Sequence, residues 1–115
     1  MTLKTSYQQG EIVSVLFPFT DVSQTKKRPA LILSNSIINQ TGDYLLVQIT
    51  SQVRNDGFSL PITSVDYVGQ SLPLTSFVRI HKIFLSNESL ILNKVTGVNP
   101  FFCQVVVAEL LKLIQ

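Results

Sequence analysis

Length, composition and charge limit the classes of protein that this chain can represent. Its 115 residues are typical of one domain with a modest core, so we expect residues 1–115 to form a single domain. The formal net charge is only +2, which excludes an extended basic interface of the histone kind. Charged residues make up 14% of the chain, below the roughly 25% of an ordinary soluble domain, so we expect apolar surface that self-association covers.

Three short apolar runs in the first half of the chain predict three successive strands. They cover residues 12–17, 30–33 and 44–49. Turn-forming residues fill the two connections, at residues 20–27 and 35–43. In the first run only Ser14 interrupts the apolar residues, which predicts a strand that is buried on both faces.

The segments that follow predict further short strands. Residues 58–62 are expected to form an edge strand, because Pro61 cannot donate a ladder hydrogen bond. Residues 77–85 predict one or two strands with a bend near His81. Residues 90–95 fit either a strand or a helical turn, and the pattern alone does not decide between them.

The C-terminal segment predicts a helix. Asn99 is a favourable N-cap, and Pro100 suits the first helical position because its missing N–H costs nothing there. The next residues are largely apolar, so a helix of about fifteen residues should pack on the sheet or on a second subunit.

The numbers of cysteine and histidine residues limit metal and redox chemistry. Cys103 is the only cysteine and His81 the only histidine, so neither a disulfide nor a Cys/His zinc site can form within the chain. No apolar run approaches the ~18 residues of a membrane-spanning helix, and residues 1–9 lack the apolar core of a signal peptide. We accordingly expect a cytoplasmic protein with no metal and no other cofactor.

Pairing between the second and third predicted strands would bring polar side chains together. In a hairpin of these strands, Ser34 lies near Tyr44 and the opposite end sets Arg28 beside two hydroxyl residues, Thr50 and Ser51. The loop between the first two strands closes over that same end. One cation and two hydroxyls under a polar loop indicate a site for a phosphate group.

Further residues are candidates for contacts with a ligand at this end of the hairpin. They are Phe19, Ser23, Gln24, Lys26, Lys27, Ser51, Gln52 and Arg79. Phe19 lies beside the first loop and outside the periodic core pattern, which makes it a candidate for stacking on a base. The cations Arg54 and Lys82 should also border the site. Each lysine and arginine has the plainer interpretation of a solvated surface charge.

Several segments carry a family resemblance. They read GEIVSVLFPFTD, KKRPALILSN and ITSQ, in this order. At this spacing they resemble the MazF/PemK-like toxins of bacterial type II toxin–antitoxin systems, and RPALILSN and ITSQ are the most specific parts. The likeness continues more weakly through SFVRIHKIF and LNKVTGV into the C-terminal helix.

The resemblance implies a fold, an activity and partners. The fold is an SH3-like β-barrel of antiparallel strands with a C-terminal helix, which is mainly β with α. The activity is that of a metal-independent endoribonuclease, which cleaves single-stranded RNA or mRNA at specific sequences and leaves 2′,3′-cyclic phosphate and 5′-OH ends. The partners are a second copy of the chain, in a homodimer, and a cognate antitoxin protein.

The resemblance also implies catalytic residues. In similar toxins the arginine of the RP pair and the threonine of the IT pair are credited with catalysis, which points to Arg28 and Thr50 here. The chemistry of the chain agrees, because one histidine cannot form a catalytic pair and the acidic residues are scattered. Arg28 would then neutralise charge on the phosphorane and Thr50 would hydrogen-bond the phosphate.

Two departures from the family pattern leave alternatives open. Relatives often carry a carboxylate ahead of the RP pair, whereas here the nearest acid is Asp21 and the general base is unidentified. His81 stands where relatives usually have an acidic residue, and it is either a strand residue or a proton relay. The alternative functions are a non-catalytic or degenerate binding protein on the same barrel, or a CcdB-like toxin that poisons DNA gyrase.

Overall fold

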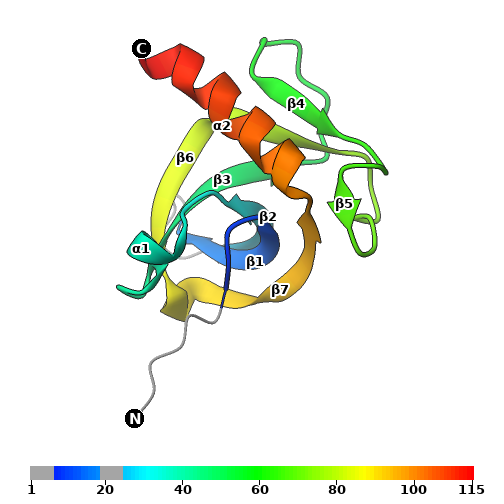
Figure 1. Ribbon diagram of the computed structural model, residues 1–115. Coiled ribbons are helices and arrows are strands. Elements are labelled where there is room, and N and C mark those ends of the chain that lie inside the picture. The colour runs from blue at the N-terminus through cyan, green and yellow to red at the C-terminus, as the bar shows by residue number, and fades with distance from the viewer. Residues whose placement is uncertain (1–6, 19–24) are drawn as a thin grey trace.

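The computed structural model describes residues 7–18 and 25–115 (Figure 1). Within these residues, seven strands form one antiparallel sheet in the order β4-β6-β3-β2-β1-β7-β5. The strands are β1 (Glu11–Pro18), β2 (Thr25–Ile32), β3 (Asp43–Thr50), β4 (Ser59–Ile62), β5 (Tyr67–Val68), β6 (Ser76–Asn87) and β7 (Ile91–Val98). The helical segments are α1 (Ser36–Asn39), the 3₁₀ helix η1 (Glu88–Leu90) and α2 (Pro100–Ile114). The sheet curls into a half-barrel, so the prediction of a mainly β fold with a C-terminal helix is confirmed.

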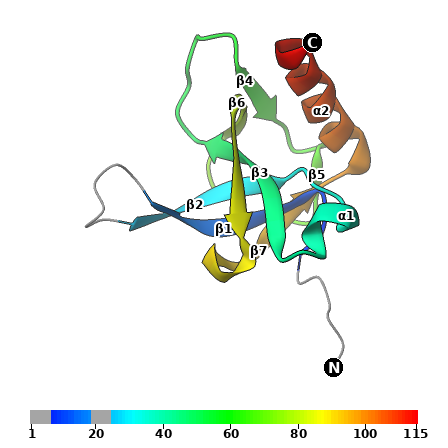
Figure 2. The same cartoon turned by 90° about the vertical axis from the view of Figure 1, so that its left-hand side faces the viewer.

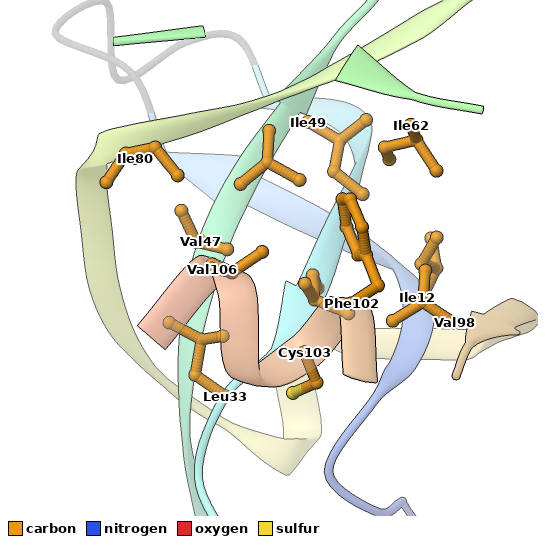
Figure 3. Close-up of a cluster of buried hydrophobic side chains, with 12 residues drawn as sticks. Ile12, Leu33, Val47, Ile49, Ile62, Ile80, Val98, Phe102, Cys103 and Val106 are labelled. Carbon is orange, nitrogen blue, oxygen red and sulfur yellow. The ribbon is translucent and has the colours of Figure 1, made fainter. Parts of the chain in front are cut away.

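The curled sheet buries apolar side chains on both of its faces. One core cluster contains Ile12, Val47 and Ile49, and α2 packs on it through Phe102 and Val106 (Figure 3). A second cluster lies on the other face and contains Val13, Val15, Phe17, Ala30, Ile32, Tyr44, Leu46 and Ile91. Successive strand residues point to opposite faces, which explains why an almost uninterrupted apolar run was needed in β1.

Helix α2 begins where the sequence predicts. The side chain of Asn99 accepts a hydrogen bond from the backbone N–H of Phe102 at 2.7 Å, and Pro100 occupies the first turn. Cys103 is buried against the sheet, and this burial raises the pKa of its thiol. Phe101 and Ile114 are 75% and 68% exposed, so only one side of this apolar helix is covered by the sheet.

The structure corrects the boundaries of the second predicted strand. It begins at Thr25 rather than at residue 30, so the last three residues of the segment that was expected to be a loop, 25–27, belong to β2. The reason is backbone pairing with β1, in which Val15 lies opposite Arg28 and Phe17 opposite Lys26. Ladder hydrogen bonds do not depend on side-chain polarity, so polar residues extend the strand beyond its apolar part.

Two further segments differ from the expectation or resolve it. Residues 90–95, which fitted either a strand or a helical turn, lie mostly in β7, and η1 precedes them. The connection between β2 and β3 contains α1, whose first turn is capped by the Asn35 side chain, a hydrogen-bond acceptor for the backbone N–H of Ile37. Both short helices have an Asn at the N-cap, which is a local helix-start signal that a pattern of apolar runs does not contain.

Candidate functional site

The predicted hairpin of β2 and β3 is confirmed, and two candidate residues, Arg28 and Thr50, lie just beyond the end of its ladder. Ala30 pairs with Gln48 and Leu31 with Val47. Continuing this antiparallel register by two residues puts Arg28 opposite Thr50. Figure 2 shows that residues 51–58, which lead from β3 to β4, rise on the side of the sheet where β2 begins.

A groove of about 700 Å³ lies at this end of the hairpin. Its lining residues come from β2, β3, β6 and the connections that follow β3 and precede β6: Lys27, Arg28, Pro29, Gln48, Ile49, Thr50, Ser51, Gln52, Arg54, Leu72, Pro73, Leu74, Ser76, Arg79 and Lys82. The lysine and arginine side chains of the lining come from β2, from the connection after β3 and from β6. No Asp or Glu occurs among the described residues that line the groove. The groove therefore suits an anionic ligand.

The environment of Thr50 leaves its hydroxyl proton available. Its oxygen accepts a hydrogen bond from the backbone N–H of Gln52 at 3.1 Å, and the hydroxyl has no acceptor among the described residues. Arg28 is exposed and Thr50 is half-buried, on neighbouring strands of the same groove. A guanidinium and a hydroxyl donor so arranged are suited to binding one phosphate group.

Arg79 differs from Arg28 because it is buried. Only 9% of the residue is exposed, and its Nη2 donates to the Asp56 carboxylate at 3.0 Å. Asp56 in turn accepts a hydrogen bond from the backbone N–H of Phe58 at 3.0 Å. This hydrogen bond, and after it the Arg79 charge, lower the pKa of Asp56, although desolvation opposes them. A buried cation needs such a partner, because an unpaired one is strongly destabilising.

His81 lies next to Arg79 but does not itself line the groove. Its ring packs on the Phe58 ring, with centroids 4.3 Å apart and planes inclined by 30°. Its Nε2 is 3.5 Å from Nη2 of Arg79. Burial, followed by the charges of Arg79 and Lys82, lowers the pKa of His81, and Asp56 only partly offsets this. The imidazole is therefore neutral at pH 7.

The predicted site residues divide into three groups. Arg28, Thr50, Lys27, Ser51, Gln52 and Arg79 all line the groove. Lys26 does not line it, because it lies farther out along β2, opposite Phe17. Phe19, Ser23 and Gln24 lie outside the described residues.

Sequence reasoning missed one part of the groove. The groove is also lined by three residues that precede β6 in the chain, Leu72, Pro73 and Leu74. Their sequence offers no chemical signal, because only the tertiary path of this connection brings them to the hairpin. Arg54 and Lys82, in contrast, border the groove as expected. No group of three His, Cys, Asp or Glu side chains in the described part of the chain is arranged to hold a metal ion.

Comparison with known proteins identifies the class of protein that this fold represents. The family described as "PemK-like, MazF-like toxin of type II toxin-antitoxin system" matches residues 8–114. The chain belongs to this family, as its sequence motifs predicted. No curated protein sequence matches it significantly.

Solved structures share the fold at low sequence identity. MazF from Deinococcus radiodurans (Form-I) is 20% identical, with 96% of this chain and 98% of that chain covered and a TM-score of 0.77. The MazE–MazF structure (Form-III) from the same organism gives 19% identity, coverage of 95% and 96%, and a TM-score of 0.76. An endoribonuclease from Mycobacterial species gives 18% identity, coverage of 98% and 95%, and a TM-score of 0.75. Within residues 7–18 and 25–115, no helix is both long and apolar enough to cross a membrane.

Proposed function

We propose that this toxin-family chain is an endoribonuclease that cleaves single-stranded RNA in the groove at the end of β2 and β3. The observation that carries the proposal is that Arg28 and Thr50 line one cationic groove, each two residues beyond the last pair of the β2–β3 ladder. Family membership and the similar fold of a mycobacterial endoribonuclease support it. RNA is an anion, and its binding in the groove agrees with the absence of carboxylates from the described lining.

The proposed reaction begins with attack of the RNA 2′-hydroxyl on the adjacent phosphorus. Arg28 binds two phosphate oxygens and neutralises the charge that develops on the phosphorane, which a planar guanidinium does with good geometry. The Thr50 hydroxyl donates a hydrogen bond to the same phosphate, and the Ser51 hydroxyl is a neighbouring hydrogen-bond donor. The bond from phosphorus to the 5′-oxygen then breaks and the 5′-oxygen takes up a proton from water, which leaves 2′,3′-cyclic phosphate and 5′-OH ends.

Proton transfer is the step to which these residues contribute least. An arginine pKa above ~12 makes Arg28 unsuitable as a general base. The described lining residues include no carboxylate and no histidine, so in this mechanism water accepts the 2′-hydroxyl proton. Catalysis then depends mainly on electrostatic stabilisation by preorganised donors, which is often the largest catalytic contribution. The reaction needs no metal ion.

The proposed partners are a second copy of the chain and an antitoxin. The low charge content and the exposed apolar residues of α2 support a homodimer. A related toxin from Deinococcus radiodurans has been crystallised as MazE–MazF, which supports an antitoxin that restrains this chain by covering the cationic groove. An acidic or extended antitoxin segment would compete with RNA for the same cations.

The test is RNA cleavage by the purified protein in the presence of EDTA. Wild-type protein should cut single-stranded RNA, and Arg28→Ala should reduce kcat by at least about 10²-fold, the effect of losing one donor to the transition state. Lys112→Ala is the control, because Lys112 is a cation on the exposed side of α2, paired with Glu109. Intact RNA together with inhibited DNA supercoiling would instead support a gyrase poison, and full cleavage by Arg28→Ala would refute the assigned role.

A further inference from the structure

A second arginine of the groove is held by residues that do not line it. Both hydrogen-bonding contacts of Arg79 with side chains involve the same nitrogen, Nη2, which lies 3.0 Å from Asp56 Oδ2 and 3.5 Å from His81 Nε2. Its Nε is buried and has no partner in the described part of the chain, and neither side-chain contact involves Nη1. The guanidinium is therefore held by one nitrogen, while its side chain lines the groove.

Asp56, which holds Arg79, lies in a segment that is hydrogen-bonded to β6. Asp56 is fixed by the backbone N–H of Phe58, and the Phe58 carbonyl accepts a hydrogen bond from the backbone N–H of Ile80 at 2.9 Å. Next to this bond, Ser59 of β4 pairs with Arg79 of β6. The Phe58 ring also lies against His81. Residues 56–59 are thus attached to β6 at the position of Arg79.

The chemistry of these contacts defines what each residue can do. A neutral imidazole accepts from Nη2 only when its own proton is on Nδ1, whereas a protonated ring would face the guanidinium with a second donor. Asp56 compensates the buried charge on one side only. The guanidinium nitrogens that Asp56 does not contact lack an anionic acceptor, and a phosphate oxygen of a nucleic acid strand would provide one.

We propose that Arg79 binds a second backbone phosphate of the RNA strand, and that Asp56 and His81 are positioning residues that hold its guanidinium toward the groove. This inference rests on the proposed function for its ligand, single-stranded RNA. It assigns Arg28 and Arg79 different tasks. Arg28 acts at the phosphate that reacts, whereas Arg79 contributes to strand affinity and leaves the chemical step unchanged.

The negative charge of Asp56 and its contact with Arg79 predict opposite effects of the same substitution on RNA binding. Asp56→Asn removes a negative charge beside the groove, so simple electrostatics predicts tighter binding of an anionic strand. If Asp56 positions Arg79, the same substitution releases the guanidinium and weakens binding. The sign of the change in Kd therefore separates the two accounts.

The experiment measures binding of a labelled single-stranded 2′-O-methyl oligoribonucleotide of random sequence by fluorescence anisotropy at pH 7.5 in EDTA. This probe has no free 2′-hydroxyl, so binding is measured without cleavage. Arg79→Gln should raise Kd about tenfold, and Asp56→Asn should raise it at least about threefold, which is within the range of coupling between contacting residues. In the Arg79→Gln background, Asp56→Asn should have no further effect.

Controls separate folding from positioning. Glu88→Gln removes the same charge from the exposed residue Glu88 of η1, which does not line the groove, and should leave Kd unchanged. His81→Phe keeps a ring against Phe58 and removes Nε2 without changing the charge at pH 7.5; it should also raise Kd, and it tests the inference if Asp56→Asn fails to fold. For Asp56→Asn and His81→Phe, KM on unmodified RNA should rise while kcat stays within about twofold of wild type, since the loss of a purely binding contact changes KM.

Three outcomes would overturn the inference. One is an unchanged or lower Kd for a folded Asp56→Asn. Another is an equal effect of Asp56→Asn in the presence and absence of Arg79. The third is a wild-type protein that does not bind the probe. Failure of wild-type protein to cut unmodified RNA while it binds the probe would refute the proposed function and leave the Kd test of Arg79 valid.

Discussion

The two ends of the hairpin formed by β2 and β3 use polar side chains in different ways. At the end near α1, Ser34 and Asn39 are buried and hydrogen-bond to each other, and the Ser34 hydroxyl also accepts from the backbone N–H of Leu45 at 2.9 Å. At the other end, Arg28 and Thr50 line an open groove. Hydroxyls occur at both ends, so residue type alone does not mark a site. What distinguishes the ends is burial: Ser34 and Asn39 are enclosed by the protein, whereas Arg28 is exposed and Thr50 is half-buried at the groove.

The largest effect that separates the two ends is expected from Thr50→Val. Valine keeps the β-branched shape and removes the hydroxyl that is proposed to donate to the phosphate. We expect kcat for RNA cleavage to fall by about 10²–10³-fold, the usual loss when one transition-state donor is removed. The free energy of unfolding should change by no more than about 0.5 kcal/mol, since the site is open to water. Single-turnover cleavage and urea denaturation measure the two quantities.

The opposite result is expected from Ser34→Ala. This change leaves the backbone N–H of Leu45 and Oδ1 of Asn39 without the hydroxyl partner that they have in the wild type. A buried polar group left unsatisfied costs about 1–3 kcal/mol, so the free energy of unfolding should fall by that order. Cleavage per folded molecule should not change. Loss of cleavage without loss of stability would contradict a structural role for this end.

The smallest effect concerns His81 and pH. Its pKa is lowered in the folded protein below the ordinary value of 6.5, so the unfolded chain takes up this proton first as the pH falls. Stability therefore rises with pH through this window, and the contribution of neutral His81 is lost as the pH drops from 6.5 toward the lowered pKa. His81→Phe should flatten the dependence of Tm on pH between about 5 and 7, because it removes a group that titrates there. An unchanged slope would mean that other groups cause it.

The sequence was sufficient for the hairpin because its information is local. Apolar runs located β1, β2 and β3, and the pairing of β2 with β3 was enough to place Arg28 and Thr50 at the same end of the hairpin. The start of β2 was wrong because β1 supplies ladder partners for polar residues as well as for apolar ones. The strand propensity of single residues does not indicate which strand will pair with them.

The rest of the groove depends on contacts between distant parts of the chain. Arg79 was a candidate for substrate binding because of its charge, but its partner Asp56 is 23 residues away and is brought there by the register of β4 on β6. Leu72 to Leu74 reach the groove only through the tertiary path of the connection to β6. Neither arrangement leaves a periodic pattern in the sequence.

The central claim is that one phosphate of a single-stranded RNA lies between Arg28 and Thr50. The most direct measurement is a crystal structure of the protein with the 2′-O-methyl oligoribonucleotide bound. We predict a backbone phosphate with its oxygens about 2.7–3.0 Å from both the Arg28 guanidinium and the Thr50 hydroxyl, the usual distances for charge-assisted and hydroxyl hydrogen bonds. A strand bound on another surface, or one that crosses the groove with its phosphates away from both side chains, would contradict the claim.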